Sequence, residues 1–488
     1  MAEKITIVHI SSEVVPFAKS GGLADVAGSL PVALSKLGQN VAVFMPYHRS
    51  VGQGRHKVTE IGCRFPVAVA DSQQEASLLQ GNLSAKVPVY FIKNDNYFDR
   101  DGLYGTPAGD YPDNAARFSF FCRAVLEAIR RLALAPDVIH CHDWQSGLIP
   151  LLLKLHYRDN PGLKETGTVF TVHNLAYQGL FDADQLAVTG LPVELFTPAG
   201  FEFHGRINFL KAGLIYSDWI TTVSQGYAGE IRTAEYGCGL EGVLEERSRN
   251  LLGILNGVDY AEWDPASDKF IAANYSREDI SGKAECKIDL VDEFGLGYAR
   301  ERPLVGVISR LAQQKGIDLL VEAGDDLVNL DLALVVLGTG EQRYHEILTE
   351  MARRYPDRIA VRLAFDNALA HKIEAGCDMF LMPSRYEPCG LNQIYSLKYG
   401  TIPIVRATGG LNDTVEQFDP ASGRGNGFKF ASYDVRQLVD TVKQAVALFE
   451  QNRPAWQKLV ANAMAGDFSW DRSAGNYLAL YRRMLSKG

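Results

Sequence analysis

Short runs of apolar residues alternate along the chain with longer stretches in which apolar residues recur every three or four positions. The first runs begin at Ile5 (ITIVHI), Val41 (VAVFMP), Val87 (VPVYFI), Asp137 (DVIHCH), Gly167 (GTVFTVHN) and Trp219 (WITTVS). Each is typical of a buried strand, and a stretch such as AARFSFFCRAVLEAIRRL from Ala115 is typical of a covering helix. The alternation predicts an α/β fold with parallel sheets and helices on both faces.

A second series of the same kind follows. It opens with LLGILNG from Leu251 and a polar stretch, and its apolar runs begin at Pro303, Leu332, Arg358, Asp378 and Thr401. We therefore predict two doubly wound domains with a boundary near residues 245–260. Residues 1–250 form the first domain, onto which a C-terminal helix of about 470–488 packs back, and residues 251–469 form the second. Such sheets bind ligands at the carboxyl ends of their strands, so two facing domains are expected to form a ligand cleft.

Composition narrows the classes of function. The 488 residues are too many for one hydrophobic core, and 47% hydrophobic with 22% charged residues is typical of a globular protein in water. A formal net charge of -9 argues against nucleic acid as the main partner. The seven cysteines include no Cys-x-x-Cys pair, which argues against disulfides and structural zinc. No signal-like segment or membrane-length apolar run is present, so we expect a cytoplasmic protein with no membrane partner.

The stretch FAKSGGLADVAGSLP contains a candidate anion site. The apolar positions from Leu23 to Leu37 follow a helical period, which places Gly21 and Gly22 at the amino terminus of a helix. Free amides and the helix dipole favour an anion there, and Lys19 can add a positive charge. The alternative is an ordinary glycine turn with a solvated lysine. The segment matches neither the P-loop pattern nor the dinucleotide fingerprint.

Two further stretches follow predicted strands of the second series. VISRLAQQKG places Arg310 and Lys315 after a strand, where two cations suit a diphosphate leaving group, although a surface turn is equally open. MPSRYEPCGLNQIYSLKYG places Glu387 in a tight loop, where it can bind sugar hydroxyls or stabilise positive charge; the alternative is a solvated acid. Gly390 and its successors begin a helix and offer amides to an anion. We read Cys389 as a packed residue rather than a nucleophile.

Histidines and amides follow other strands. His173 follows the run GTVFTV, and IHCHDWQSG contains two histidines and Asp143, but no convincing set of further ligands supports a metal, so none is predicted. A structural role for His173 remains open. Asn256 lies at the proposed hinge. In VVLGTGEQR the third glycine position holds Arg343, which argues against a nicotinamide cofactor.

Taken together, these stretches resemble one family. KSGGLADVAGSLP, HCHDWQSGL, TVHNLAYQG, NGVD, SRLAQQKG, SRYEPCGLNQ and YGTIPIVRATGGLNDTV are similar, in this order, to segments of bacterial glycogen synthases and plant starch synthases. The resemblance runs from Ile5 to about Tyr481. It implies a GT-B glycosyltransferase, with two Rossmann-like domains facing across a cleft. It also implies transfer of glucose from ADP-glucose to the non-reducing end of an α-1,4-glucan, with retention and without a cofactor.

The resemblance also assigns roles to individual residues. The lysine of K-[ST]-G-G-L, here Lys19, binds the sugar nucleotide. Arg310 and Lys315 match the pair that holds the diphosphate. Glu387 matches the glutamate that contacts the transferred glucose, and His173 matches the histidine beside that sugar.

Other matched positions complete the implied pocket. Asp143 and Asn256 match polar residues near the sugar. The donor-binding set also includes Gly21, Gly22, Cys389, Gly390, Leu391, Asn392 and Phe365. Asn392 departs from a frequent threonine, and Phe365 stands where some relatives carry a tyrosine against the adenine, so stacking is kept and a hydroxyl contact is lost. Ser20 and Ala24 are milder departures.

The chemistry sets requirements that these residues can meet. Cations and amides stabilise the leaving ADP, and a carboxylate stabilises the charge at the anomeric carbon. No nucleophile for double displacement is evident, so we expect front-face attack through an oxocarbenium-like state. If Lys19 and Arg310 serve one ligand, the domains must close on it.

Four alternative functions remain to be compared. A UDP-glucose-dependent glucan synthase or another retaining nucleotide-sugar glycosyltransferase has the same fold. A glycan phosphorylase needs a lysine-bound pyridoxal phosphate. A non-catalytic glucan-binding protein would not need a diphosphate cluster, and an oxidoreductase would need the missing third glycine.

Overall fold

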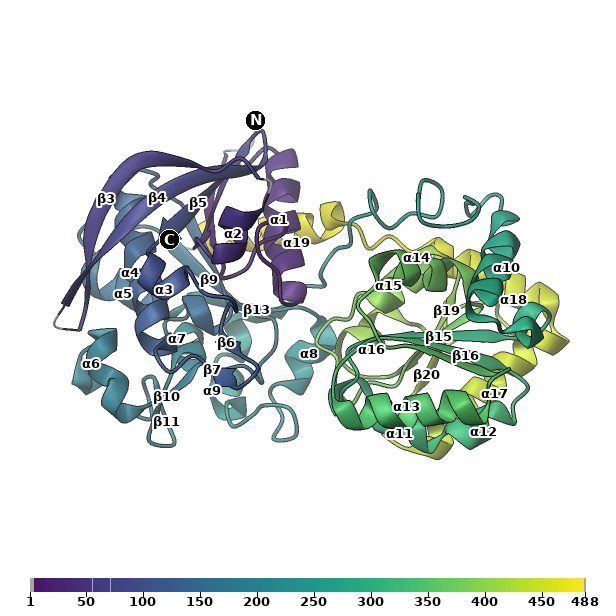
Figure 1. Cartoon of the computed structure of the whole chain (residues 1–488). Coiled ribbons are helices and arrows are strands. Elements are labelled where there is room, and N and C mark those ends of the chain that lie inside the picture. The colour runs from purple at the N-terminus through teal and green to yellow at the C-terminus, as the bar shows by residue number, and fades with distance from the viewer. Residues whose placement is uncertain (1–3, 55, 71, 487–488) are drawn as a thin grey trace. The chain divides into compact units, whose positions relative to one another are not determined.

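The computed structural model describes residues 4–54, 56–70 and 72–486. The chain divides into two compact units. The first comprises Met1–Val223, Ala228–Gly257 and Trp470–Gly488, and the second comprises Ser224–Tyr227 and Val258–Ser469. Each unit consists of a sheet with helices packed against it (Figure 1).

The first unit contains a sheet of nine strands. Their order is β14 (Leu251–Gly253), β13 (Trp219–Thr222), β9 (Gly167–Val172), β8 (Val138–His142), β1 (Thr6–Ile10), β2 (Asn40–Pro46), β5 (Val87–Lys93), β4 (Ser72–Ser84) and β3 (Thr59–Val69). Every pair from β14 to β5 is parallel. The six apolar runs predicted as strands in this unit are therefore confirmed as strands.

Two elements of this sheet differ from the prediction. β14, which was expected to open the second series, is the edge strand of the first sheet because it pairs with β13. β3 and β4 were not predicted; they extend the sheet as antiparallel strands. Buried and exposed residues alternate along the end of β3, so this strand lacks the continuous apolar run of a parallel strand.

The second unit contains six parallel strands. Their order is β17 (Ile359–Arg362), β16 (Ala333–Leu337), β15 (Leu304–Ile308), β18 (Met379–Met382), β19 (Ile402–Arg406) and β20 (Phe428–Phe430). The first five were predicted and are confirmed. β20 was not predicted, because three residues are too short for a periodic signal.

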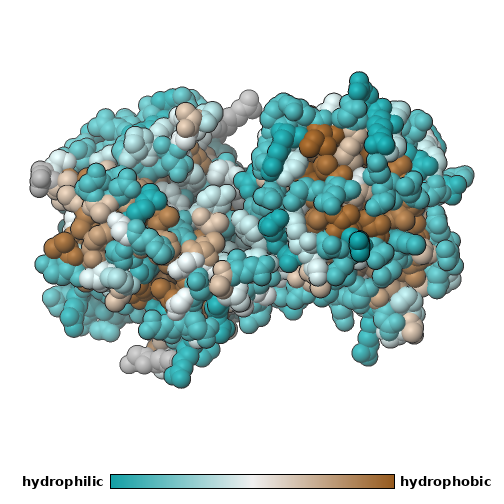
Figure 2. All heavy atoms as spheres, turned by 90° about the horizontal axis from the view of Figure 1, so that it is seen from below, coloured by the Kyte–Doolittle hydropathy of each residue, from teal (hydrophilic) through white to brown (hydrophobic). Residues whose placement is uncertain are grey.

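The longer helices cover these sheets (Figure 1). In the first unit they are α1 (Gly22–Lys36), α4 (Asn114–Arg131), α5 (Ile149–His156), α7 (Phe209–Tyr216) and α19 (Trp470–Leu485). In the second they are α10 (Gly282–Phe294), α13 (Gln342–Arg354), α14 (Asn367–Gly376), α15 (Asn392–Lys398), α17 (Val435–Gln451) and α18 (Arg453–Met464). Among the described residues, no helix combines the length and apolar character needed to cross a membrane. Hydrophilic atoms cover most of the face shown in Figure 2, with hydrophobic atoms in patches on each unit.

The C-terminal helix completes the core of the first unit. Tyr477 and Tyr481 of α19 share one buried cluster with Val26 and Leu30 of α1 and with residues of the central strands. Figure 1 shows α19 (yellow) beside α1 (purple). The Tyr481 hydroxyl also forms a 2.7 Å hydrogen bond with Nδ1 of His140 on β8. The helix α19 therefore packs against the central strands of the first unit's sheet.

We expect Tyr481→Phe to destabilise the first unit. Tyr481 and His140 are both fully buried, so the change leaves the His140 Nδ1 atom without a partner and should lower the free energy of unfolding by about 1–3 kcal/mol. Urea titration followed by intrinsic fluorescence measures this change. Tyr177→Phe, at a side chain that is 53% exposed, is the control and should change stability by less than about 0.5 kcal/mol. Equal effects of the two substitutions would contradict the structural role of this bond.

Candidate active site

Glu13 organises the glycine-rich loop before α1. Its carboxylate accepts hydrogen bonds from the backbone N–H and the hydroxyl of Ser20 and from the backbone N–H of Gly21. The Tyr104 hydroxyl donates a further hydrogen bond to it. Glu13 is only 3% exposed. The Gly21 amide, which was predicted to meet a ligand anion, is thus bonded to a carboxylate of the chain itself.

The two glycines of this loop leave space beside the backbone. A Cβ atom added at Gly21 or at Gly22 would meet no atom of the described residues within 4 Å. Neither has a positive φ angle, and Gly21 is extended. Neither packing nor backbone conformation therefore requires glycine at these two positions, whereas close approach of a ligand to the backbone would.

Lys19 lies at the edge of the same loop. Its ammonium group pairs with Asp25 of α1 at 2.8 Å, and the two side chains are 51% and 31% exposed. Such an exposed pair contributes little to stability. Lys19 is therefore accessible, and its partner can be exchanged for a ligand at small cost.

Asp143 follows β8 in an uncommon conformation. Its φ is +55°, a value that non-glycine residues rarely adopt and that is concentrated at functional sites. The backbone N–H of His173 donates a 2.8 Å hydrogen bond to its Oδ1. Burial raises the pKa of Asp143 to about 7, and the nearby charge of Glu13 acts in the same direction.

His173 joins a line of buried histidine side chains. Its Nε2 lies 3.0 Å from Nδ1 of His142, and Nε2 of His142 lies 3.1 Å from Nδ1 of His9. His140 bonds instead to Tyr481 and, at 2.6 Å, to Thr171. His9, His140 and His142 are close enough to one another to hold a metal ion. An ion bound to all three would have to break hydrogen bonds of His140 and His142.

Asn256 lies after β14. It is 6% exposed, and its Oδ1 atom is buried without a hydrogen-bond partner among the described residues. A buried amide oxygen in this state costs free energy unless a ligand or water satisfies it. The first unit thus carries Lys19, the two glycines, Asp143, His173 and Asn256, all after strands of one parallel series.

In the second unit, Lys315 and Glu387 form an ion pair. Lys315 Nζ lies 2.6 Å from Glu387 Oε2, although 72 residues separate them in the chain. The Lys315 side chain is 23% exposed and that of Glu387 is 7% exposed. Ser384 donates a 3.1 Å hydrogen bond to the same carboxylate oxygen. The structure thus brings together two of the predicted catalytic residues.

A glycine allows this pairing. Gly316 follows Lys315 with φ +73°, and a Cβ there would lie 2.0 Å from the Pro383 carbonyl oxygen. Only glycine lets the loop after β15 approach the loop after β18 so closely. Arg310, also after β15, donates a 2.9 Å hydrogen bond to Gln314 and stays exposed.

The loop from Cys389 to Asn392 has a defined conformation. Gly390 has φ +71°, and Gln393 donates to the carbonyls of both Cys389 and Gly390. Cys389 is buried, as a packed residue would be. The Asn392 side chain donates a 2.7 Å hydrogen bond to the Ile308 carbonyl of β15, so at least one of its two amide hydrogens is directed into the protein. Leu391 precedes the first residue of α15.

Phe365 lies between β17 and α14. It is 90% exposed, more than any other large hydrophobic residue among the described residues. An aromatic ring in this position has a face free for stacking, as predicted for contact with a base.

Sequence reasoning missed several residues at these places. Glu13, Tyr104 and Ser384 bond directly to loops or carboxylates of the predicted site. Glu13 comes three residues after the end of the buried strand β1, and this position at the carboxyl end of a strand is the only local signal that it carries. Its partners Ser20 and Gly21 belong to the K-[ST]-G-G-L motif, but no spacing in the sequence links that motif to Glu13.

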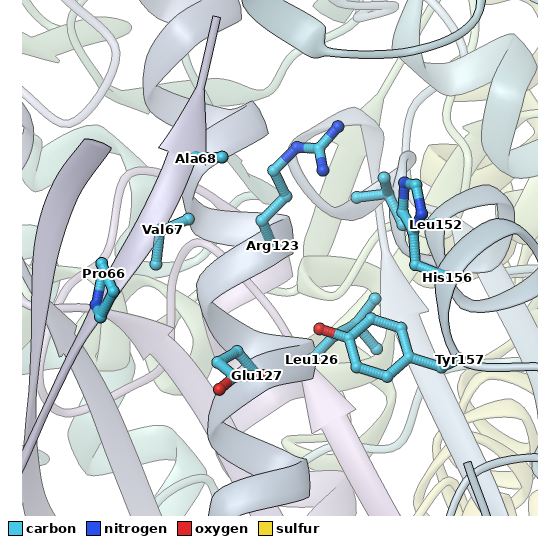
Figure 3. Close-up of a pocket in the computed structure, with 9 residues that line it drawn as sticks. All are labelled: Pro66, Val67, Ala68, Arg123, Leu126, Glu127, Leu152, His156 and Tyr157. Atoms are coloured by element: carbon cyan, nitrogen blue, oxygen red, sulfur yellow. The ribbon is translucent and has the colours of Figure 1, made fainter. Parts of the chain in front are cut away.

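A pocket of about 200 Å³ lies elsewhere in the first unit (Figure 3). It is lined by Pro66, Val67, Ala68, Arg123, Leu126, Glu127, Leu152, His156 and Tyr157. Its charged groups already have partners, since Arg123 donates to the Thr189 carbonyl and Glu127 accepts from two neighbouring arginines. None of the predicted site residues lines it.

Comparison with known proteins identifies the family of the chain. Residues 6–246 match the family model described as starch synthase catalytic domain, and residues 292–458 match glycosyl transferases group 1. The chain is 52% identical to a glycogen synthase of Koribacter versatilis over 98% of both chains. It is 46% identical to a glycogen synthase of Thermotoga maritima over 99% of both.

A solved structure of high similarity is the catalytic domain of starch synthase IV from Arabidopsis thaliana, bound to ADP and acarbose. It has a TM-score of 0.90 and 35% identity, and the match covers 99% of this chain and 100% of that one. A sucrose-phosphate synthase from Thermosynechococcus elongatus, with a TM-score of 0.57 and 17% identity, shares the fold. The chain therefore belongs to the glycogen and starch synthase family of glycosyltransferases and has the GT-B fold, built from two Rossmann-like domains.

Proposed function

We propose that this protein is a cytoplasmic glycogen synthase. It transfers glucose from ADP-glucose to the non-reducing end of an α-1,4-glucan and retains the configuration at the anomeric carbon. The observation that carries the proposal is the 2.6 Å pair of Lys315 and Glu387, the cation assigned to the diphosphate and the carboxylate assigned to the glucose. The names of the full-length relatives and the ADP and acarbose bound to starch synthase IV support the same substrates.

The second unit is proposed to bind the leaving group. Arg310 offers a planar fork of donors to the diphosphate, and Lys315 adds a focused charge. Lys315 is held by Glu387, whose carboxylate also accepts a hydrogen bond from Ser384. Because these groups are already in place, little reorganisation is needed when negative charge grows on ADP. The amides of Gly390 and Leu391 are assigned to the same diphosphate by family resemblance.

The first unit is proposed to contribute Lys19 and the open glycine loop. Glu13 holds the Ser20 and Gly21 amides, so the loop is ordered without a ligand. The space beside Gly21 and Gly22 then admits a ligand to the backbone. His173 and Asn256 are proposed to contact the transferred sugar. The Asn256 oxygen, which has no partner among the described residues, can accept a hydrogen bond from a sugar hydroxyl.

The state of the carboxyl groups favours front-face attack over double displacement. A pKa of about 7 leaves much of Asp143 protonated near neutral pH, and a protonated carboxyl group is a poor nucleophile. The Glu387 carboxylate forms an ion pair with Lys315 at 2.6 Å, which lowers its tendency to attack the anomeric carbon. We propose that the bond between the anomeric carbon and ADP breaks as the acceptor oxygen bonds to the same face of that carbon, and that the leaving ADP oxygen takes the proton of the acceptor hydroxyl.

The donor base is a separate question. The exposed ring of Phe365 can stack on adenine or on uracil, so a UDP-glucose-dependent glucan synthase is the second candidate.

Transfer of radiolabelled glucose to glycogen tests the proposed function. We expect faster incorporation from ADP-glucose than from UDP-glucose, with label in a product that an α-1,4-specific glucosidase releases. Arg310→Ala should lower the rate by about 10²–10³ because it removes a donor to the leaving group. Arg343→Ala, at an exposed arginine paired with Glu341, is the matched control. Preference for UDP-glucose would select the second candidate, and no transfer from either donor would overturn the proposal.

Lys19→Ala should weaken donor binding more than acceptor binding. The loss of a charged donor to the diphosphate corresponds to about 1.5–3 kcal/mol, or a rise in the KM for ADP-glucose of roughly tenfold to a hundredfold. Steady-state kinetics with ADP-glucose and maltooligosaccharide varied in turn measure both constants. Lys36→Ala, at an exposed lysine in the last turn of the same helix, should change neither. Equal losses for donor and acceptor would contradict the assignment.

Asp143→Asn should change how stability depends on pH. A carboxyl group with a raised pKa binds its proton more tightly in the folded state than in the unfolded state. Its contribution to the stability of the folded state is therefore fully present below about pH 4 and is lost as the pH rises toward about 7. Asparagine cannot ionise and keeps the oxygen that accepts from His173. The variant should therefore gain in Tm relative to the unmodified protein between about pH 5 and pH 8.5. Thermal unfolding followed by circular dichroism at both pH values measures this; a constant difference would contradict the raised pKa.

A further inference from the structure

Three histidines form a hydrogen-bonded line across three neighbouring strands of the first unit. His9 lies on β1, His142 ends β8, and His173 follows β9. Nδ1 of His9 lies 3.1 Å from Nε2 of His142, and Nδ1 of His142 lies 3.0 Å from Nε2 of His173. Each contact joins an Nδ1 atom to an Nε2 atom. The line therefore runs in one direction, from the core to the candidate active site.

The parallel register of the strands produces this line. His9 pairs with His140 between β1 and β8, and His142 pairs with Thr171 between β8 and β9. Because side chains of a strand alternate between two faces, His9, His142 and the residue two positions after Thr171, His173, share one face of the sheet. Successive rings are offset toward the carboxyl edge.

All three rings are neutral at physiological pH. Burial lowers the pKa of His9 and of His173 to about 3, and it lowers the pKa of His142 well below its usual range. A neutral imidazole carries one N–H and one lone pair. Each of the two contacts therefore needs one ring to donate and the other to accept.

Only two proton arrangements satisfy both contacts. In the first, Nδ1–H of His9 donates to His142, and Nδ1–H of His142 donates to His173, which then presents its own Nδ1–H. In the second, every proton is on Nε2, the bonds run the other way, and His173 presents a lone pair at Nδ1. The two arrangements differ at the ends of the line, at His9 Nε2 and at His173 Nδ1.

The buried end distinguishes them. His9 is fully buried, and its Nε2 atom has no hydrogen-bond partner among the described residues. The second arrangement would place an N–H there, and a buried N–H without an acceptor is rarer and costlier than an unused lone pair. The first arrangement leaves only a lone pair at His9 Nε2 and keeps both hydrogen bonds.

We propose that His9 and His142 are positioning residues that hold His173 as its Nδ1–H tautomer. His173 then donates a hydrogen bond to an oxygen of the bound sugar and does not accept one. This inference rests on the proposed function for the identity of the sugar, whereas the order of protons rests on the line of rings alone. In the described part of the chain, no hydrogen bond occupies His173 Nδ1, so this donor is available to a substrate oxygen.

Nuclear magnetic resonance of the full chain tests the proton order directly. Long-range 1H–15N correlations on protein labelled with [15N]histidine distinguish the two neutral tautomers, and single substitutions assign the signals. We expect protons on Nδ1 of His9, His142 and His173. An Nε2–H signal at His9 or His173 would overturn the proposal without any assay of activity.

A substitution tests the role of His142. His142→Leu removes the donor to His173 Nε2, so His173 should lose its single-tautomer state, and kcat/KM for ADP-glucose should fall about tenfold. His140→Leu is the matched control, because His140 is equally buried on the same face but bonds outside the line. It should lower the Tm and leave the His173 tautomer unchanged.

The outcomes separate this inference from the proposed function. A single Nδ1–H signal at His173 in His142→Leu, with unchanged kcat/KM, would show that His142 does not set the tautomer. The expected tautomers in a protein that transfers no glucose would overturn the proposed function and leave the proton order standing.

Discussion

Compensation of the buried Glu387 carboxylate is the constraint on which the second unit's part of the site depends. A charge in such a buried position is costly unless it is paired and hydrogen-bonded. Lys315 supplies the opposite charge at 2.6 Å, and Ser384 supplies a neutral donor. Meeting this requirement forces the loops after β15 and β18 together, and the glycine at 316 makes that approach possible. The cation assigned to the leaving group is thus fixed by the carboxylate assigned to the sugar.

The first unit meets a similar requirement with neutral donors. The Glu13 carboxylate is surrounded by two backbone amides and two hydroxyl groups of Ser20, Gly21 and Tyr104. Hydrogen bonds to an ionised acceptor are stronger than those between neutral groups, so this arrangement can hold a loop that has few side-chain contacts. It also means that the helix dipole of α1 acts first on a charge of the protein. A ligand anion at this loop would depend more on Lys19 and on the open side of the glycines than on the Gly21 amide.

The predictability of the structure follows from the range of the interactions. Buried parallel strands give continuous apolar runs, so β1, β2, β5, β8, β9 and β13, together with β15 to β19, could be predicted. β3 and β4 could not, because one face is solvated and their pairing depends on the edge of the sheet. The motifs SRLAQQKG and SRYEPCGLNQ drew attention to Lys315 and Glu387 in the sequence. The Lys315–Glu387 contact joins positions 72 residues apart, and the line of histidines depends on the register of three strands. No local pattern encodes either.

The glycines of the two units differ in whether the packing of the protein itself requires them. At Gly316 and Gly410 a Cβ atom would collide with a carbonyl oxygen about 2 Å away, so the fold itself requires glycine there. At Gly22 the backbone is helical, and a Cβ would meet nothing within 4 Å. Gly22 is the first residue of α1, and neither its packing nor its φ angle requires glycine. The structure therefore gives no internal reason for glycine at position 22, whereas the proposed approach of a ligand to the backbone of this loop would supply one.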